Sequence, residues 1–176
     1  DGTTPLQLDQ PRAAFRLKAG LTWSDGQPLT ASDSVYGYRL AADPHSPTLK
    51  LAFEQTADYR ALDGVTVEWV GKPGLVRENY ADYFWMPLPQ HAWGVYSASD
   101  LLEAEESTRR PLGWGAYRLA EWLPGVEIRL EKNPFYFRAD KGLPYFEQLV
   151  FKITNPNGDS NIANLKFDHE PFEVYN

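Results

Sequence analysis

Two alternating runs near the middle of the chain constrain its fold most. Apolar and polar residues alternate from Ala116 to Trp122 and again from Val126 to Leu130, as in strands with one apolar face. The tripeptide Leu123-Pro124-Gly125 separates the runs by a length that suits a hairpin connection. The two runs therefore predict an antiparallel β-hairpin.

Other segments add further strands and several helices to this hairpin. Strands are expected over residues 13–17, 65–70 and 146–153, and helices over 31–42, 48–59, 75–84 and 99–108. This mixture predicts an α+β (mixed α/β) fold. From Pro111 onward the sequence pattern predicts mainly strands, so we expect the chain to divide into residues 1–110 and 111–176.

The segment 23–33, WSDGQPLTASD, concentrates polar side chains that resemble a catalytic motif. Its spacing predicts structure instead. Asp25 followed by Gly26 is turn chemistry, because Asp bonds nearby main chain and Gly accepts a positive φ. Thr30 and Asp33 stand three residues apart before an apolar stripe, which is the spacing of a capping box at a helix start. Neither aspartate is expected to be catalytic.

Composition excludes several functional classes. The chain has 176 residues, a net charge of −7 and no cysteine, so it lacks a basic surface for nucleic acid and has no thiolate for catalysis or zinc. His45, His91 and His169 stand far apart and in no metal-ligand spacing. We expect no metal, no cofactor and no enzymatic activity, because no nucleophile–base set is visible.

Aromatic residues make up 14% of the chain and are its best candidates for ligand contact. Trp69 and Trp122 lie in expected strands, where a position in the core is favoured. Trp85 and Trp114 lie in loops rich in proline or glycine, where binding residues are common. We therefore predict that Trp114 contacts the ligand, and we name Trp85 as the second candidate.

Five segments in the same order resemble the family 5 extracellular solute-binding proteins of bacterial ABC importers, the peptide- and nickel-binding type. Each is weak alone, but their order along most of the chain makes the resemblance specific. They are FRLKAGLTWSDGQPLTASD at 15–33, DPHSP at 43–47, LPQH at 88–91, PLGWGAYRL at 111–119 and LEKNPFYF at 130–137.

This resemblance implies a fold and a function. The fold would be part of the type II periplasmic-binding-protein fold, with residues 1–110 as the small subdomain of the first lobe and 111–176 as part of its central sheet. The function would be capture of a solute, most simply an oligopeptide, for ABC permease subunits. An oligosaccharide ligand, or a stand-alone interaction or structural module on the same scaffold, stays open as an alternative.

The resemblance also implies a place in the cell and a missing partner. Such proteins are extracytoplasmic, at the cell surface or in the periplasm, and the parent would reach the membrane only through a lipid anchor that this chain lacks. The second lobe of the same protein is absent from the sequence, so the chain is expected to be a fragment. Because half of a two-lobed cleft would be missing, we expect this chain alone to bind ligand weakly or not at all.

Overall fold

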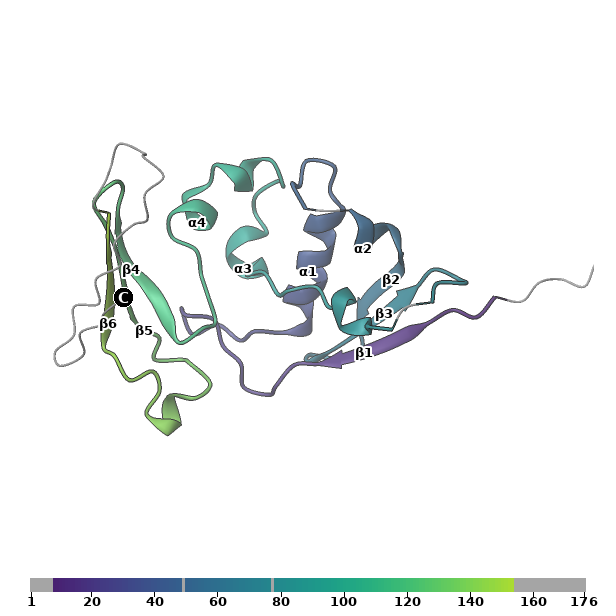
Figure 1. Ribbon diagram of the computed structural model, residues 1–176, viewed down its shortest axis with the longest axis horizontal. Coiled ribbons are helices and arrows are strands. Elements are labelled where there is room, and N and C mark those ends of the chain that lie inside the picture. The colour runs from purple at the N-terminus through teal and green to yellow at the C-terminus, as the bar shows by residue number, and fades with distance from the viewer. Residues whose placement is uncertain (1–7, 49, 77, 154–176) are drawn as a thin grey trace, which may run out of the picture. The chain divides into compact units, whose positions relative to one another are not determined.

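The computed structural model describes residues 8–48, 50–76 and 78–153, which form two compact units (Figure 1). The first unit contains the described residues up to Ala19 and residues 29–102, and the second contains residues 20–28 and the described residues from Glu103 onward. The expected division at 110/111 thus falls inside the second unit. The assignment of residues 1–110 and 111–176 to parts of a first lobe stays a prediction.

The first unit packs one long helix on a three-stranded antiparallel sheet of order β1-β3-β2. Its strands are β1 (Arg12–Arg16), β2 (Thr56–Ala61) and β3 (Thr66–Gly71). Helix α1 (Ala31–Ala42) is joined by the short elements α2 (Leu51–Glu54), η1 (Tyr80–Tyr83), α3 (Gln90–Trp93) and η2 (Asp100–Leu102).

Trp69 is the centre of the core of this unit, as the sequence predicts. Its side chain is fully buried and stacks on Tyr83, with ring centroids 4.2 Å apart. The indole N–H donates to the hydroxyl of Thr56 at 2.8 Å, so the one polar group of this buried ring is satisfied. The central strand β3 therefore carries the main anchor of the apolar core.

The start of α1 confirms the predicted capping arrangement. The main-chain N–H of Thr30 donates to the carboxylate of Asp33 at 2.8 Å, and the Thr30 hydroxyl lies 3.2 Å from the same oxygen. The other carboxylate oxygen accepts from the main-chain N–H of Gln90 at 3.2 Å. Asp33 is buried, so it both begins the helix and ties it to α3.

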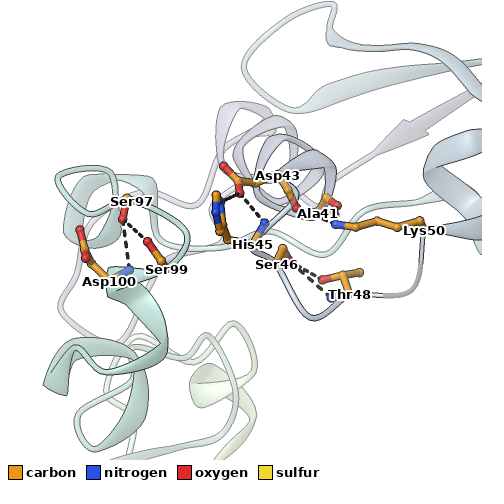
Figure 2. Close-up of polar contacts among 9 residues, drawn as sticks. All are labelled: Ala41, Asp43, His45, Ser46, Thr48, Lys50, Ser97, Ser99 and Asp100. Carbon is orange, nitrogen blue, oxygen red and sulfur yellow. Dashed lines mark hydrogen bonds and ion pairs between the residues drawn. The ribbon is translucent and has the colours of Figure 1, made fainter.

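The end of α1 is closed by a lysine from the following loop. Figure 2 shows the Lys50 ammonium donating to two main-chain carbonyls, those of Ala41 at 2.6 Å and Asp43 at 2.7 Å. The main-chain N–H of His45 donates to the Asp43 carboxylate and holds its pKa below the ordinary value. Unpaired carbonyls at a helix C-terminus favour a cation, so these contacts fix the helix exit.

The second unit is built on another antiparallel sheet, of order β4-β5-β6. The strands are β4 (Tyr117–Leu123), β5 (Glu127–Lys132) and β6 (Gln148–Lys152), with the short elements α4 (Glu105–Thr108) and η3 (Ala139–Lys141). The register pairs Trp122 with Ile128 and confirms the predicted hairpin.

Two kinds of sequence prediction are wrong. The core position expected for Trp122 is one, because its side chain is 38% exposed. It lies near the end of an edge strand whose last four residues are all exposed. The other kind is helix length, because three predicted helices are much shorter in the structure. The segment 48–59 contains only α2 before β2 begins, and the segment 75–84 contains only η1. The segment 99–108 is divided between η2 and α4. Pairing of β2 with β3 overrides the local helical preference of residues 56–59.

Across the part of the chain that the structure describes, no helix combines the length and the apolar character that crossing a membrane requires.

Candidate functional site

The segment Trp23–Gln27 forms a tight turn, as the sequence predicts. The main-chain N–H of Trp23 donates to the carbonyl of Gln27 at 2.8 Å, and the N–H of Gly26 donates to the carbonyl of Trp23 at 2.9 Å. The Asp25 carboxylate accepts from the N–H of Gln27 at 3.0 Å. Gly26 has φ +90°, and a Cβ there would meet the ring of Phe135 at 3.0 Å, so glycine is required.

This turn holds the loop that carries Trp114. The main-chain N–H of Ser24 donates to the carbonyl of Gly113 at 2.7 Å, and the Ser24 hydroxyl accepts from the N–H of Gly113 at 3.3 Å. On the other side, the side-chain amide of the buried Asn133 donates to the carbonyl of Gly115 at 2.9 Å. The main chain on both sides of Trp114 is therefore fixed from two directions.

Trp114 itself is half-buried on this fixed loop. Its indole makes no hydrogen bond and no ring contact with the other described residues. Its two neighbours in the chain are glycines, which have no side chain that could cover the ring. A large apolar ring with a free N–H donor, on a rigid loop, is suited to contacting a ligand. Ligand contact by Trp114 stays a prediction that this geometry favours.

Trp85 has a different environment, in the first unit. Its ring packs against the core and meets Tyr38 edge to face at 5.4 Å. Its carbonyl accepts from the hydroxyl of Ser34, and its N–H donates to the hydroxyl of Tyr59 at 3.2 Å. The indole N–H is buried and has no acceptor among the residues that the structure describes. These contacts give Trp85 a packing role, and its contact with a ligand stays a prediction.

A buried hydroxyl pair supports this arrangement. Ser34 and Tyr59 lie 2.8 Å apart and both are buried. Burial raises the pKa of the Tyr59 phenol above its ordinary value, more than the hydrogen bonds lower it. Tyr59 is therefore a neutral donor and acceptor at neutral pH, and the Ser34 hydroxyl is shared between this phenol and the main-chain carbonyl of Trp85.

The second unit contains an open groove of about 660 Å³ along β4. One wall is β4 and the other includes the start of α4 and the segment that follows it, which lie beside β4 in Figure 1. The groove is lined by Ser24 and Asp25 of the turn, Glu105, the run 109–112, the run 118–122 and Glu131.

Several charged side chains of the groove form ion pairs. Ion pairs join the charged groups to one another or to β5: Arg110 with Glu105 at 2.8 Å, Arg118 with Glu131 at 2.7 Å, and Arg129 with Glu121 at 3.2 Å. Arg109 also lines the groove and is exposed, but its guanidinium has no ion pair or hydrogen bond with any described residue. The lining of the groove as a whole carries more carboxylates than guanidinium groups, because Asp25 also belongs to it.

No metal centre is found in the described ranges, where no three His, Asp or Glu side chains lie close enough to hold an ion. His169 lies outside the described residues. Sequence reasoning missed the groove and Arg109, because the lining combines residues 24–25 with separate segments between residues 105 and 131. The clustering of Arg109 and Arg110 beside Pro111 was the only local signal.

The chain belongs to the bacterial extracellular solute-binding proteins, family 5. The family model with the description "Bacterial extracellular solute-binding proteins, family 5 Middle" matches residues 9–168. The family resemblance predicted from the five segments is thereby confirmed, and the family is one of solute-binding proteins that act outside the cytoplasm.

Individual relatives agree with this family. The oligopeptide-binding protein AppA of Bacillus subtilis is 29% identical over 86% of this chain and 27% of its own length. The probable deoxycholate-binding periplasmic protein YgiS of Escherichia coli is 61% identical over 71% of this chain and 26% of its own length. This chain therefore spans about a quarter to a third of the length of the curated relatives that it matches.

A solved structure confirms the fold class. The structure of AppA from Bacillus subtilis in complex with a nonapeptide superposes with a TM-score of 0.69 and 26% identity, over 80% of this chain and 28% of that one. The α+β scaffold described above is thus part of a type II periplasmic-binding-protein fold.

Proposed function

We propose that this chain is part of the solute-binding component of an ABC importer and that its cargo is an oligopeptide. The observation that carries the proposal is the similarity to AppA, in sequence over 86% of the chain and in structure at a TM-score of 0.69 to a nonapeptide complex. In this role the protein captures its solute without making or breaking a bond.

In this proposal the two predicted tryptophans have different roles, and the geometry of each supports its role. Trp114 supplies an aromatic surface to the cargo, because its loop is fixed by Ser24 and Asn133 and its indole is uncommitted. Trp85 is the second candidate for contact with the cargo, and its ring also packs against the core of the first unit. A rigid aromatic contact loses little conformational entropy on binding, which favours recognition of varied peptide side chains.

The partners of the whole protein follow from this role. They are the ABC permease subunits, which receive the loaded protein, and the second lobe, which closes over the solute. We place residues 1–110 in the small subdomain of the first lobe and residues 111–176 in its central sheet. A lipid anchor would hold the parent protein at the membrane.

A second cargo is favoured by one observation. The relative with 61% identity is described as a probable deoxycholate-binding protein. Deoxycholate is an amphipathic steroid with one carboxylate, and an exposed indole suits its apolar rings as well as it suits a peptide. The second candidate is therefore a bile acid bound by the same protein.

Calorimetric titration of the full-length natural protein separates these cargoes. One arm uses an equimolar pool of nonapeptides and the other uses deoxycholate below its micelle concentration. Heat from the peptide pool alone supports the first proposal, and heat from deoxycholate alone replaces it by the second. Trp114→Ala should weaken binding of the cargo, while Trp114→Phe should restore most of it. Unchanged affinity in Trp114→Ala removes Trp114 from the site.

A further inference from the structure

We propose that Asn133 is a positioning residue, which orients Trp114 toward the cargo and does not touch the cargo itself. The inference rests on the proposed function, because it takes Trp114 as a contact of the cargo. It concerns the Trp114 loop, which is the segment 113–115. Asn133 follows β5 directly and stands 18 residues beyond Gly115 in the chain.

The first argument is burial. Among the described residues of the second unit, the buried ones are Trp23, Ser24 and Asn133. Asn133 is only 1% exposed, and burying an amide is costly unless its polar atoms are hydrogen-bonded. Ser24 and Asn133 are the two polar members of this set, and both bond the Trp114 loop. The most buried part of this unit therefore supports that loop.

The second argument is the pair of contacts that the Asn133 side chain makes. Its amide nitrogen donates to the carbonyl of Gly115 at 2.9 Å, and its amide oxygen accepts from the main-chain N–H of Phe135 at 3.0 Å. The main-chain N–H of Asn133 also donates to the carbonyl of Ala116, at 2.9 Å. Because an amide offers a donor and an acceptor together, one side chain joins the loop to the turn that carries Phe135.

The third argument is that these contacts lead back to the other end of the loop. The ring of Phe135 lies so close to Gly26 that a Cβ there would be 3.0 Å from it. Gly26 and Ser24 belong to one turn, and Ser24 bonds the main chain of Gly113 twice, at 2.7 and 3.3 Å. The loop is thus held at both ends by one connected set of contacts, all within the second unit.

The fourth argument is that packing restrains the loop little. A Cβ at Gly115 would meet no other atom within 4 Å, and one at Gly113 would meet only the main-chain nitrogen of Gly115, at 4.0 Å. The hydrogen bonds of Ser24 and Asn133 therefore decide the direction in which the indole of Trp114 points. A binding side chain keeps its productive orientation only where such supporting bonds fix it.

The first test measures the orientation of Trp114 in the full-length natural protein labelled with 5-fluorotryptophan. The fluorine signal of Trp114 is the one that disappears in Trp114→Phe. Asn133→Asp keeps the oxygen that accepts from Phe135 and loses the donor to Gly115, so it should shift or broaden this signal. The signal of Trp69 should stay in place, since that ring lies in the core of the first unit.

A second variant removes the same donor without introducing a charge. In Asn133→Ser the shorter side chain can still accept from the N–H two residues on, as serine does in turns, but it does not extend to Gly115. It should therefore change the Trp114 signal as Asn133→Asp does. Tyr117→Phe is the matched control, because it removes a hydrogen bond to the carbonyl of Phe146 in the same unit and should leave the signal unchanged.

The second test measures affinity by calorimetric titration, with the nonapeptide pool and deoxycholate as separate probes. Asn133→Ser should weaken the probe that binds by about two- to tenfold, which corresponds to one hydrogen bond. In the Trp114→Ala background the same change should have no further effect, because the ring that it positions is gone. Tyr117→Phe should bind as the natural protein does.

Two results would overturn the proposal. One is an unchanged Trp114 signal in both Asn133 variants. The other is an equal loss of affinity with and without the indole, since Asn133 would then act on the whole unit and not through Trp114. Unchanged affinity in Trp114→Ala would instead refute the proposed contact between Trp114 and the cargo, and a shifted fluorine signal in Asn133→Ser would still show that Asn133 orients the ring.

Discussion

Replacing Asp33 with alanine should destabilise the first unit without any direct effect on a ligand. The carboxylate accepts from the main-chain N–H of Thr30 at 2.8 Å and from that of Gln90 at 3.2 Å, and the residue is only 5% exposed. Alanine removes both acceptors and leaves the two N–H donors behind in a partly buried position.

The magnitude follows from these two bonds. Loss of a helix-capping contact costs about 1 kcal/mol. A buried N–H left without its acceptor, here that of Gln90, costs about 1–3 kcal/mol more. The free energy of unfolding should therefore fall by about 2–4 kcal/mol in Asp33→Ala. Asp33→Asn keeps one acceptor and should lose about half of this amount.

Urea unfolding followed by tryptophan fluorescence measures this loss, because the buried Trp69 reports on the same unit. With a slope of about 2 kcal/mol per molar urea, the midpoint should fall by about 1–2 M. Asp25→Ala is the control, since its turn bond to Gln27 is exposed and should shift the midpoint far less. Equal midpoints for Asp33→Ala and Asp25→Ala would refute the structural role of Asp33, as would loss of binding with unchanged stability.

Three further predictions concern the packing of the first unit. Gly37→Ala should lower the free energy of unfolding by about 1–3 kcal/mol, because a Cβ there would lie closer than 3.0 Å to the carbonyl oxygen of Met86; an unchanged thermal midpoint contradicts this. Trp85→Phe should cost less than about 1.5 kcal/mol, because it removes a buried N–H that has no acceptor; chemical denaturation checks it, and a larger loss would reveal a partner for that N–H. Burial raises the pKa values of Tyr36 and Tyr59, so their contribution to stability is complete below the ordinary value of 10.0 and is lost as the pH rises through the raised values. Thermal midpoints should fall above about pH 10, and Tyr59→Phe should flatten that fall.

Local sequence signals predicted the elements that depend on near neighbours. The start of α1 follows from Thr30 and Asp33, which lie three residues apart, and the β4–β5 hairpin follows from alternation around a short turn. The helix predicted over residues 48–59 is wrong, because the second part of this segment belongs to β2 and pairs with β3. No local pattern contains that pairing.

The site was predictable in part, for a related reason. Trp114 could be proposed from its glycine-flanked loop, but the bonds that fix this loop come from Ser24 and Asn133, many residues away. The family resemblance connected these segments where their spacing did not. Trp122 was wrongly placed in the core, because alternation marks the apolar face of a strand and does not say whether another layer covers it.

Native mass spectrometry of the protein purified from its own cells tests the central claim most directly. A solute-binding component should carry a small non-covalent adduct that is released on activation, and tandem analysis of that adduct should give a peptide sequence. An adduct with the mass of a bile acid would select the second cargo. A protein with no adduct, and with no mass shift after incubation with either the peptide pool or deoxycholate, would contradict the account.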